Sequence, residues 1–182
     1  MKKTLFLFAM VGLTNLAIAQ KKQTTTSATI NFDATTSIDA LPKAENKTVI
    51  ASLDTKTGNI AFESIIKSFT FTNPRMQEHF NGEKWMNSEK FPTATFTGKI
   101  ADMKAVNFKK DGSYTVAVNG NLTLHGITKP VTTKANVTVA RKKISTQTDF
   151  TIDLADYGVN GSAIAAGKVA TNPKISVIAN FK

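Results

Sequence analysis

Residues 114–124 read Tyr-Thr-Val-Ala-Val-Asn-Gly-Asn-Leu-Thr-Leu, and this stretch decides the fold. One face of the alternation consists of Tyr114, Val116, Val118, Gly120, Leu122 and Leu124. Thr, Ala and Asn residues occupy the positions between them. Because successive side chains of a strand point to opposite faces, the stretch predicts a long β-strand with one buried face, beginning after a turn at Asp111-Gly112.

The same alternation extends outward through the rest of the chain. It predicts further short strands within residues 28–32, 49–53, 60–62, 69–71, 93–100, 131–140, 144–154 and 175–181. Eight or so strands joined mostly by short turns describe an antiparallel meander. Closure into a barrel removes the exposed edges of such a sheet. We therefore expect an all-β fold, an eight-stranded antiparallel β-barrel whose interior is either filled by side chains or holds one small apolar ligand, as in lipocalins.

One or two short helices interrupt the strands. Asn73 is a capping residue type, Pro74 suits the first helical position, and Asn81-Gly82 ends the segment. A weaker alanine-rich segment covers residues 162–170 and is broken by Gly167.

The N-terminal 19 residues have the pattern of a cleaved signal peptide. Lys2 and Lys3 precede an apolar run over residues 5–13, and the segment ends on Ala17-Ile18-Ala19. The apolar run is far shorter than the roughly 20 residues of a membrane-spanning helix. We expect cleavage before Gln20, a flexible mature N-terminus over residues 20–27, and one domain over residues 28–182 in the periplasm or secreted.

The composition excludes several kinds of chemistry. The 182 residues contain no cysteine and two histidines, so disulfides, thiolate metal sites and cysteine nucleophiles are excluded. No serine-nucleophile elbow, phosphate-binding loop or dinucleotide fingerprint occurs. Asp153 and Asp156 lie near a strand end, where acids commonly cap turns. The sequence predicts neither an enzyme nor a cofactor nor a metal site, although a two-histidine site with distant carboxylates stays open.

The formal charge of +10 raises the question of anionic partners. Lysines are scattered through the polar faces and turns without interleaved stacking aromatics, which disfavours nucleic acid. A solvated outer face is the simpler interpretation, and transient contact with an anionic membrane surface is the alternative.

Four segments together resemble the YceI-like family of exported lipid-binding proteins. They are Phe69-Thr70-Phe71 with Met76-Gln77-Glu78-His79-Phe80, then residues 89–96 (Glu-Lys-Phe-Pro-Thr-Ala-Thr-Phe), 120–131 (Gly-Asn-Leu-Thr-Leu-His-Gly-Ile-Thr-Lys-Pro-Val) and 149–159 (Asp-Phe-Thr-Ile-Asp-Leu-Ala-Asp-Tyr-Gly-Val). The resemblance covers roughly residues 28 to 181. It implies a lipocalin-like barrel with a long apolar cavity for an isoprenoid or similar amphiphilic lipid, without catalysis.

Strand alternation and the resemblance together supply candidate site residues. The inward-facing apolar set is Phe69, Phe71, Phe96, Val116, Val118, Leu122, Phe150 and Ile152. A lid or plug is expected from Met76, Phe80, Trp85 and Met86. Candidates for a polar ligand headgroup are Arg75, His79, His125 and Lys129. Lys129 as an ordinary turn residue and His125 as a hairpin cap are the structural alternatives.

Two other protein classes stay open. A small outer-membrane β-barrel has this size and strand number, but two Tyr and one Trp cannot build two aromatic girdles, and the outward faces carry lysine. A filled barrel that acts as a structural or interaction module differs from a lipid carrier only in lacking the cavity. The sequence also permits a homodimer.

Overall fold

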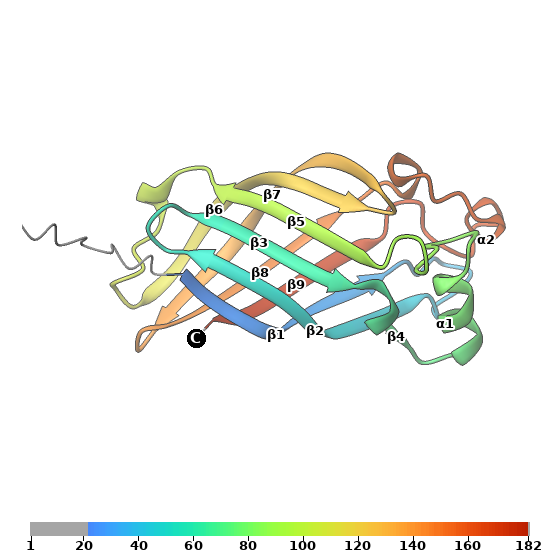
Figure 1. Ribbon diagram of the computed structural model, residues 1–182, viewed down its shortest axis with the longest axis horizontal. Helices are drawn as coiled ribbons and strands as arrows, with labels where there is room; N and C mark the ends of the chain where they lie inside the picture. The colour runs from blue at the N-terminus through green and yellow to red at the C-terminus, as the bar shows by residue number, and fades with distance from the viewer. Residues whose placement is uncertain (1–21, 182) are drawn as a thin grey trace, which may run out of the picture.

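The protein is a closed antiparallel β-barrel, as predicted (Figure 1). The structure, a computed structural model, describes residues 22–181. Eight strands follow one another in the order β1–β9–β8–β7–β6–β5–β3–β2, and the pairing of β1 with β2 closes the ring. The bounds are β1 Lys22–Asp33, β2 Lys43–Asp54, β3 Asn59–Ile65, β5 Thr93–Ile100, β6 Gly112–Leu124, β7 Ile127–Ala140, β8 Lys143–Thr151 and β9 Lys174–Phe181.

Both α-helices lie at one end of the barrel, which we call the helix end (Figure 1). The connection between β3 and β5 forms a 3-10 turn, Ile66–Ser68, then the two-residue strand β4, Thr70–Phe71, then α1, Pro74–Asn81. The connection between β8 and β9 forms a second 3-10 turn, Leu154–Tyr157, and α2, Ser162–Ala165. A third 3-10 turn, Met103–Ala105, precedes β6.

The first predicted helix begins and ends as its sequence indicates. The side chain of Asn73 accepts a hydrogen bond from the backbone N–H of Arg75, Pro74 is the first helical residue, and the helix ends before Gly82. The second predicted helix is shorter than expected, because α2 ends at Ala165 and Gly167 adopts a left-handed backbone conformation with φ of 69°.

The prediction of a flexible segment over residues 20–27 is wrong for residues 22–27. These residues form the first half of β1, where Lys22 pairs with Asp54 and Thr25 pairs with Ala51 of β2. The pairing register then shifts between Thr25 and Ala28. A polar strand with a register shift has no continuous apolar alternation, so the sequence pattern did not show it. The expected signal peptide lies outside the described residues.

Two tight turns set the register of the central hairpins. His125 and Gly126 join β6 to β7, and Arg141 and Lys142 join β7 to β8; all four residues have positive φ angles. Two-residue loops with positive φ at both positions match the right-handed twist of the flanking strands. The register that follows places Val118 opposite Thr133, so the apolar face of the sequence that decides the fold points into the barrel.

Apolar side chains gather at the two ends of the barrel interior. The cluster at the helix end includes Ile66, Phe69, Phe80, Met86 and Leu154. The cluster toward the opposite end includes Leu53, Ile100, Val116, Val137 and Phe181. The candidate functional site is a space between the two clusters.

Candidate functional site

An apolar cavity runs inside the barrel between the two clusters and is lined by members of both. Its volume is about 150 Å³. Ile175 and Phe181 of β9 both line it, and six strand residues span about 20 Å. This volume spread over such a length describes a long and narrow channel. An apolar cavity of this kind stays dry and favours apolar ligands.

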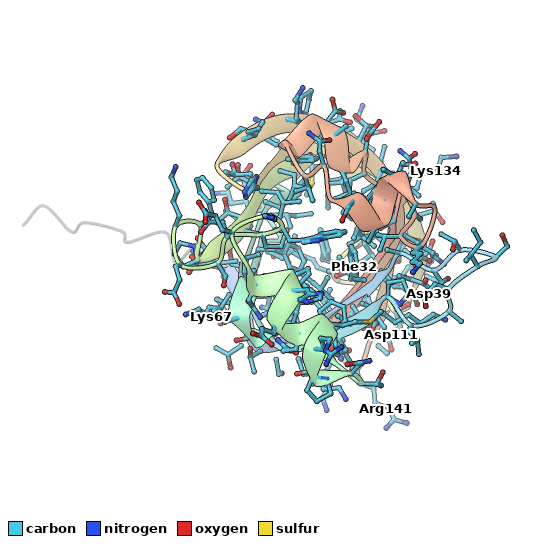
Figure 2. All side chains as sticks on the ribbon, turned by 90° about the vertical axis from the view of Figure 1, so that its right-hand side faces the viewer. Phe32, Asp39, Lys67, Asp111, Lys134 and Arg141 are labelled. Atoms are coloured by element: carbon cyan, nitrogen blue, oxygen red, sulfur yellow. The ribbon has the colours of Figure 1, made fainter. Side chains whose placement is uncertain are left out.

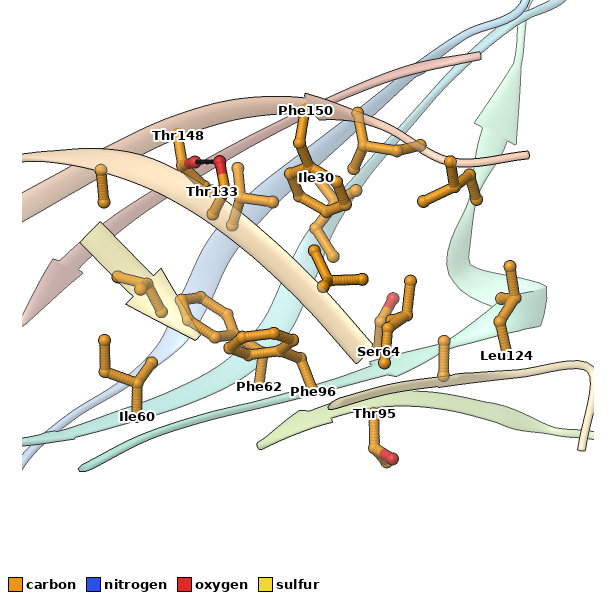
Figure 3. A pocket seen from close by; sticks show the side chains of 18 of the residues that line it. Ile30, Ile60, Phe62, Ser64, Thr95, Phe96, Leu124, Thr133, Thr148 and Phe150 are labelled. Atoms are coloured by element: carbon orange, nitrogen blue, oxygen red, sulfur yellow. Dashed lines mark hydrogen bonds between the residues drawn. The ribbon is translucent and has the colours of Figure 1, made fainter. Parts of the chain in front are cut away.

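Strand alternation delivers the lining side chains. Figure 3 shows Ile30, Ile60, Phe62, Phe96 and Phe150 projecting into the space from different strands. Each of these residues occupies an inward position of its strand, and its neighbours along the chain face outward.

Nine of the twelve predicted cavity or lid residues line the cavity. They are Phe69, Phe80, Met86, Phe96, Val116, Val118, Leu122, Phe150 and Ile152. Phe80 of α1 and Met86 of the following loop line it from the helix end, where the sequence placed a lid. Phe80 also contacts Phe32, Phe69 and Phe71, with ring centroids 6.1, 5.7 and 5.0 Å away.

The other three predicted residues do not line the cavity. Phe71 packs against Phe80 behind the lining layer. Met76 is half-buried on α1, outside both apolar clusters. Trp85 packs against Gly161, where an added Cβ would lie 2.8 Å from two atoms of the indole ring. Trp85 therefore joins the loop after α1 to the segment before α2.

Three hydroxyl groups of the lining, those of Ser64, Thr133 and Thr148, have protein partners. The Oγ1 atoms of Thr133 and Thr148 lie 2.9 Å apart, and Thr148 donates to the carbonyl oxygen of Lys134 (Figure 3). Ser64 Oγ accepts a hydrogen bond from Asn46 Nδ2, which is fully buried. Because these polar atoms have partners, the channel presents methyl and methylene groups and aromatic rings to its contents.

None of the four predicted headgroup residues lines the cavity. Arg75 and His79 lie exposed on α1. Figure 2 looks onto the helix end, with α1 in front. His125 Nδ1 is hydrogen-bonded to the carbonyl oxygen of Tyr157, 2.9 Å away, and its ring meets the edge of Phe91. Lys129 Nζ lies 3.3 Å from an oxygen of Asp156 in an exposed ion pair. No charged residue among residues 22–181 lines the cavity.

Several aspartate side chains accept hydrogen bonds from backbone N–H groups two residues further along the chain. The carboxylate of Asp54 accepts hydrogen bonds from the backbone N–H groups of Lys56 and Thr57, and these bonds, with the charge of Lys56, lower its pKa. Burial raises the pKa of Tyr157, and the neighbouring Asp156 carboxylate adds to this effect. Within the described part of the chain, no three His, Asp or Glu residues form a cluster that could hold a metal ion.

Sequence reasoning missed much of the channel toward the end opposite the helices. Leu53, Ile60, Ile100, Val137 and Phe181 line it, although the same alternation that identified Val116 marks them as inward-facing. The alternation of apolar and polar residues is present at these five positions, but the predicted site did not include them.

The chain belongs to the YceI-like family, because the family's domain matches residues 14–181. Protein YceI of Salmonella newport is 40% identical over 60 residues, which cover 33% of this chain and 27% of that protein. The matched stretch thus spans about a quarter of that relative.

Two solved structures share the fold. A polyisoprenoid-binding domain from Saccharophagus degradans superposes with a TM-score of 0.75 at 16% identity, covering 88% of this chain and 97% of that one. The YceI protein of Campylobacter jejuni superposes with a TM-score of 0.53 at 18% identity, covering 100% and 99%. At these identities the likeness concerns the fold. Among residues 22–181 no helix is both long and apolar enough to cross a membrane.

Proposed function

We propose that this protein binds an isoprenoid or a similar single-chain amphiphilic lipid inside the barrel, and that it carries or sequesters this lipid without catalysing a reaction. The observation that carries the proposal is the narrow cavity, whose lining contains no charged side chain and is formed mainly by apolar residues. The name of the Saccharophagus degradans domain, which binds polyisoprenoid, supports the same ligand class.

The energetics favour a hydrocarbon chain over a polar ligand. Each buried methylene contributes about 0.8 kcal/mol before the costs of ordering the ligand are subtracted. A polar or charged ligand group in this channel would lose its hydration and find no charged partner among the described lining residues. We therefore place the headgroup outside the channel, at the helix end, near Arg75 and His79.

The outer face of the barrel supports a water-facing protein rather than an outer-membrane barrel. Outward side chains of β6 and β7 pair as hydrogen-bonded polar residues, such as Thr115 with Asn136 and Asn119 with Thr132. Lys134 lies on the same exposed face. A membrane-spanning barrel needs an outward apolar band.

We propose that the protein acts in the periplasm or outside the cell after loss of residues 1–19. N-terminal sequencing of the exported form should then begin at Gln20.

Native mass spectrometry tests the proposed ligand class. Protein purified without detergent from a bacterial host should carry a lipid-sized adduct, or should take up geranylgeraniol after delipidation. Sugars and nucleotides of similar mass serve as negative controls. A protein that arrives empty and ignores geraniol, farnesol and geranylgeraniol alike would contradict the proposal. Release into the soluble fraction without detergent separates it from the outer-membrane alternative.

A further inference from the structure

Two glycines face each other on the inner side of the barrel. Gly98 of β5 and Gly120 of β6 are directly paired across the two strands. Their neighbours at the alternate positions, Phe96 and Ile100 on β5, line the cavity, so the glycines also face inward. The sheet therefore lacks two adjacent side chains at this level. We call this gap the glycine recess, formed by Gly98 and Gly120.

The ring of Phe96 occupies the glycine recess. A Cβ atom added at Gly98 would lie 2.7 Å from Cζ and 2.8 Å from Cε1 of this ring, and one added at Gly120 would lie closer still to Cζ. Real Cβ atoms essentially never approach another atom within 3.0 Å. The ring thus lies flat against the backbone of both strands, and only glycine at both positions leaves room for it.

The glycine recess is at the junction between the two halves of the channel. Phe96 packs against the cluster that includes Ile100 and Phe181, whereas Leu122, its partner on β6, packs against the cluster at the helix end. Phe62 of β3 pairs with Phe96 from the other side, and Figure 3 shows the two rings adjacent in the lumen. A ring displaced from the recess at this level would stand across this narrow channel.

We infer that the glycine recess sets the length of hydrocarbon that the protein accepts. By holding Phe96 against the wall, it keeps the inner half of the channel continuous with the helix end. This inference rests on the proposed function, since it concerns the same cavity. With the ring lifted, a ligand chain would stop at Phe96, and each methylene left outside would weaken binding roughly fourfold.

Aromatic rings also cover glycines in sheets simply to stabilise them. Such a structural role predicts a change in stability upon substitution but no dependence of binding on ligand length. The ratio of the affinities for a long and a short isoprenoid is therefore the measurement that separates the two roles.

The test compares geraniol with geranylgeraniol in native mass spectrometry of delipidated protein. We expect Gly120→Ala to bind geraniol within about twofold of the unmodified protein and to bind geranylgeraniol at least about tenfold more weakly. The double variant Phe96→Ala with Gly120→Ala should recover geranylgeraniol, because the displaced ring is gone.

A second variant covers the case in which Gly120→Ala does not fold, since its Cβ also approaches the carbonyl oxygen of Thr97 at 2.5 Å. Phe96→Trp keeps both glycines but carries a ring too large for the recess, and it should lose geranylgeraniol in the same selective way. Circular dichroism verifies folding of every variant. Equal binding of geranylgeraniol by folded Phe96→Trp and unmodified protein, or a loss shared equally by both ligands, would overturn the inference. If the unmodified protein binds neither alcohol, the proposed function itself fails.

Discussion

The hydroxyl groups of Thr133 and Thr148 face each other across β7 and β8, with 2.9 Å between their Oγ1 atoms. Thr148 also donates to the carbonyl oxygen of Lys134. The two side chains satisfy each other in a mainly apolar lining, so the loss of one hydroxyl removes a hydrogen-bond partner from the other.

This pair should show strong coupling in stability. We expect Thr133→Val or Thr148→Val alone to lower the free energy of unfolding by about 1 kcal/mol, because the hydrogen bond between the two hydroxyls is lost. The double variant should cost less than the sum of the two single changes. Urea titration of the four proteins measures the coupling; strictly additive costs would contradict the argument.

Phe80 is the residue on which the helix end depends most. Phe80→Ala removes three ring contacts and should lower the free energy of unfolding by about 3 kcal/mol, with faster release of bound geranylgeraniol. The matched control on the same helix is Met76→Ala, since Met76 lies outside both clusters, and it should change both quantities far less. Thermal unfolding and a ligand-dilution time course provide the two measurements.

The contact between Trp85 and Gly161 offers a direct optical test. Gly161→Ala places a methyl group where the indole ring now lies, so the ring must move toward water. Because Trp85 is the single tryptophan of the chain, its fluorescence maximum should shift to longer wavelength. The adjacent exposed residue supplies the control, and Ser162→Ala should leave the spectrum unchanged. An unshifted spectrum in folded Gly161→Ala would show that the ring does not rest on Gly161.

Stability should fall in acid through Asp54. Its pKa is lowered in the folded protein by the backbone N–H groups of Lys56 and Thr57 and by the charge of Lys56, so its contribution is complete above the ordinary aspartate pKa. That contribution is lost as the pH decreases through the lowered value. Asp54→Asn should therefore flatten the acid side of a plot of unfolding free energy against pH. The same plot of unfolding free energy against pH for Asp39→Asn provides the comparison. A curve unchanged by Asp54→Asn would contradict this assignment.

The exposed basic residues of α1, Arg75 and His79, should matter only for ligands with an anionic headgroup. Arg75→Gln combined with His79→Gln should weaken binding of farnesyl diphosphate by about threefold to tenfold and leave farnesol unchanged. Lys129→Gln serves as a control, because Asp156 already pairs with Lys129. Equal binding of farnesyl diphosphate by the double variant and the unmodified protein would remove α1 as the headgroup site.

The sequence predicted the barrel because alternation is a direct consequence of burying one face of each strand. The alternation alone predicts the inward direction of Val116, Val118 and Ile152, which line the cavity. The first half of β1 escaped prediction because Thr25 is buried among polar neighbours and the register shifts before Ala28. The local sequence pattern does not show that a segment will pair with a strand far away in the chain.

The helix end was harder to predict for a different reason. Phe71 and Trp85 belong to connections, where neither a period of two nor a helical period assigns a direction to the side chain. His125 illustrates the same limit, since its role as a hairpin residue bonded to Tyr157 depends on a contact 32 residues away. The role of Gly98 and Gly120 could not be predicted from the sequence either. It depends on the ring of Phe96, which occupies the space that side chains at these two positions would fill.

The closure of the barrel fixes where Lys22 and Phe181, the first and last described residues, lie. Lys22 pairs with Asp54 beside the β2–β3 turn, and Phe181 pairs with Ile144 beside the β7–β8 turn, so both lie at the end away from α1 and α2 (Figure 1). A reporter domain fused after Phe181, or a resin to which either terminus is tethered, would therefore leave α1 and α2 turned toward the surrounding solution. Immobilised in this orientation, the protein could be used to extract its own ligand from a complex lipid mixture.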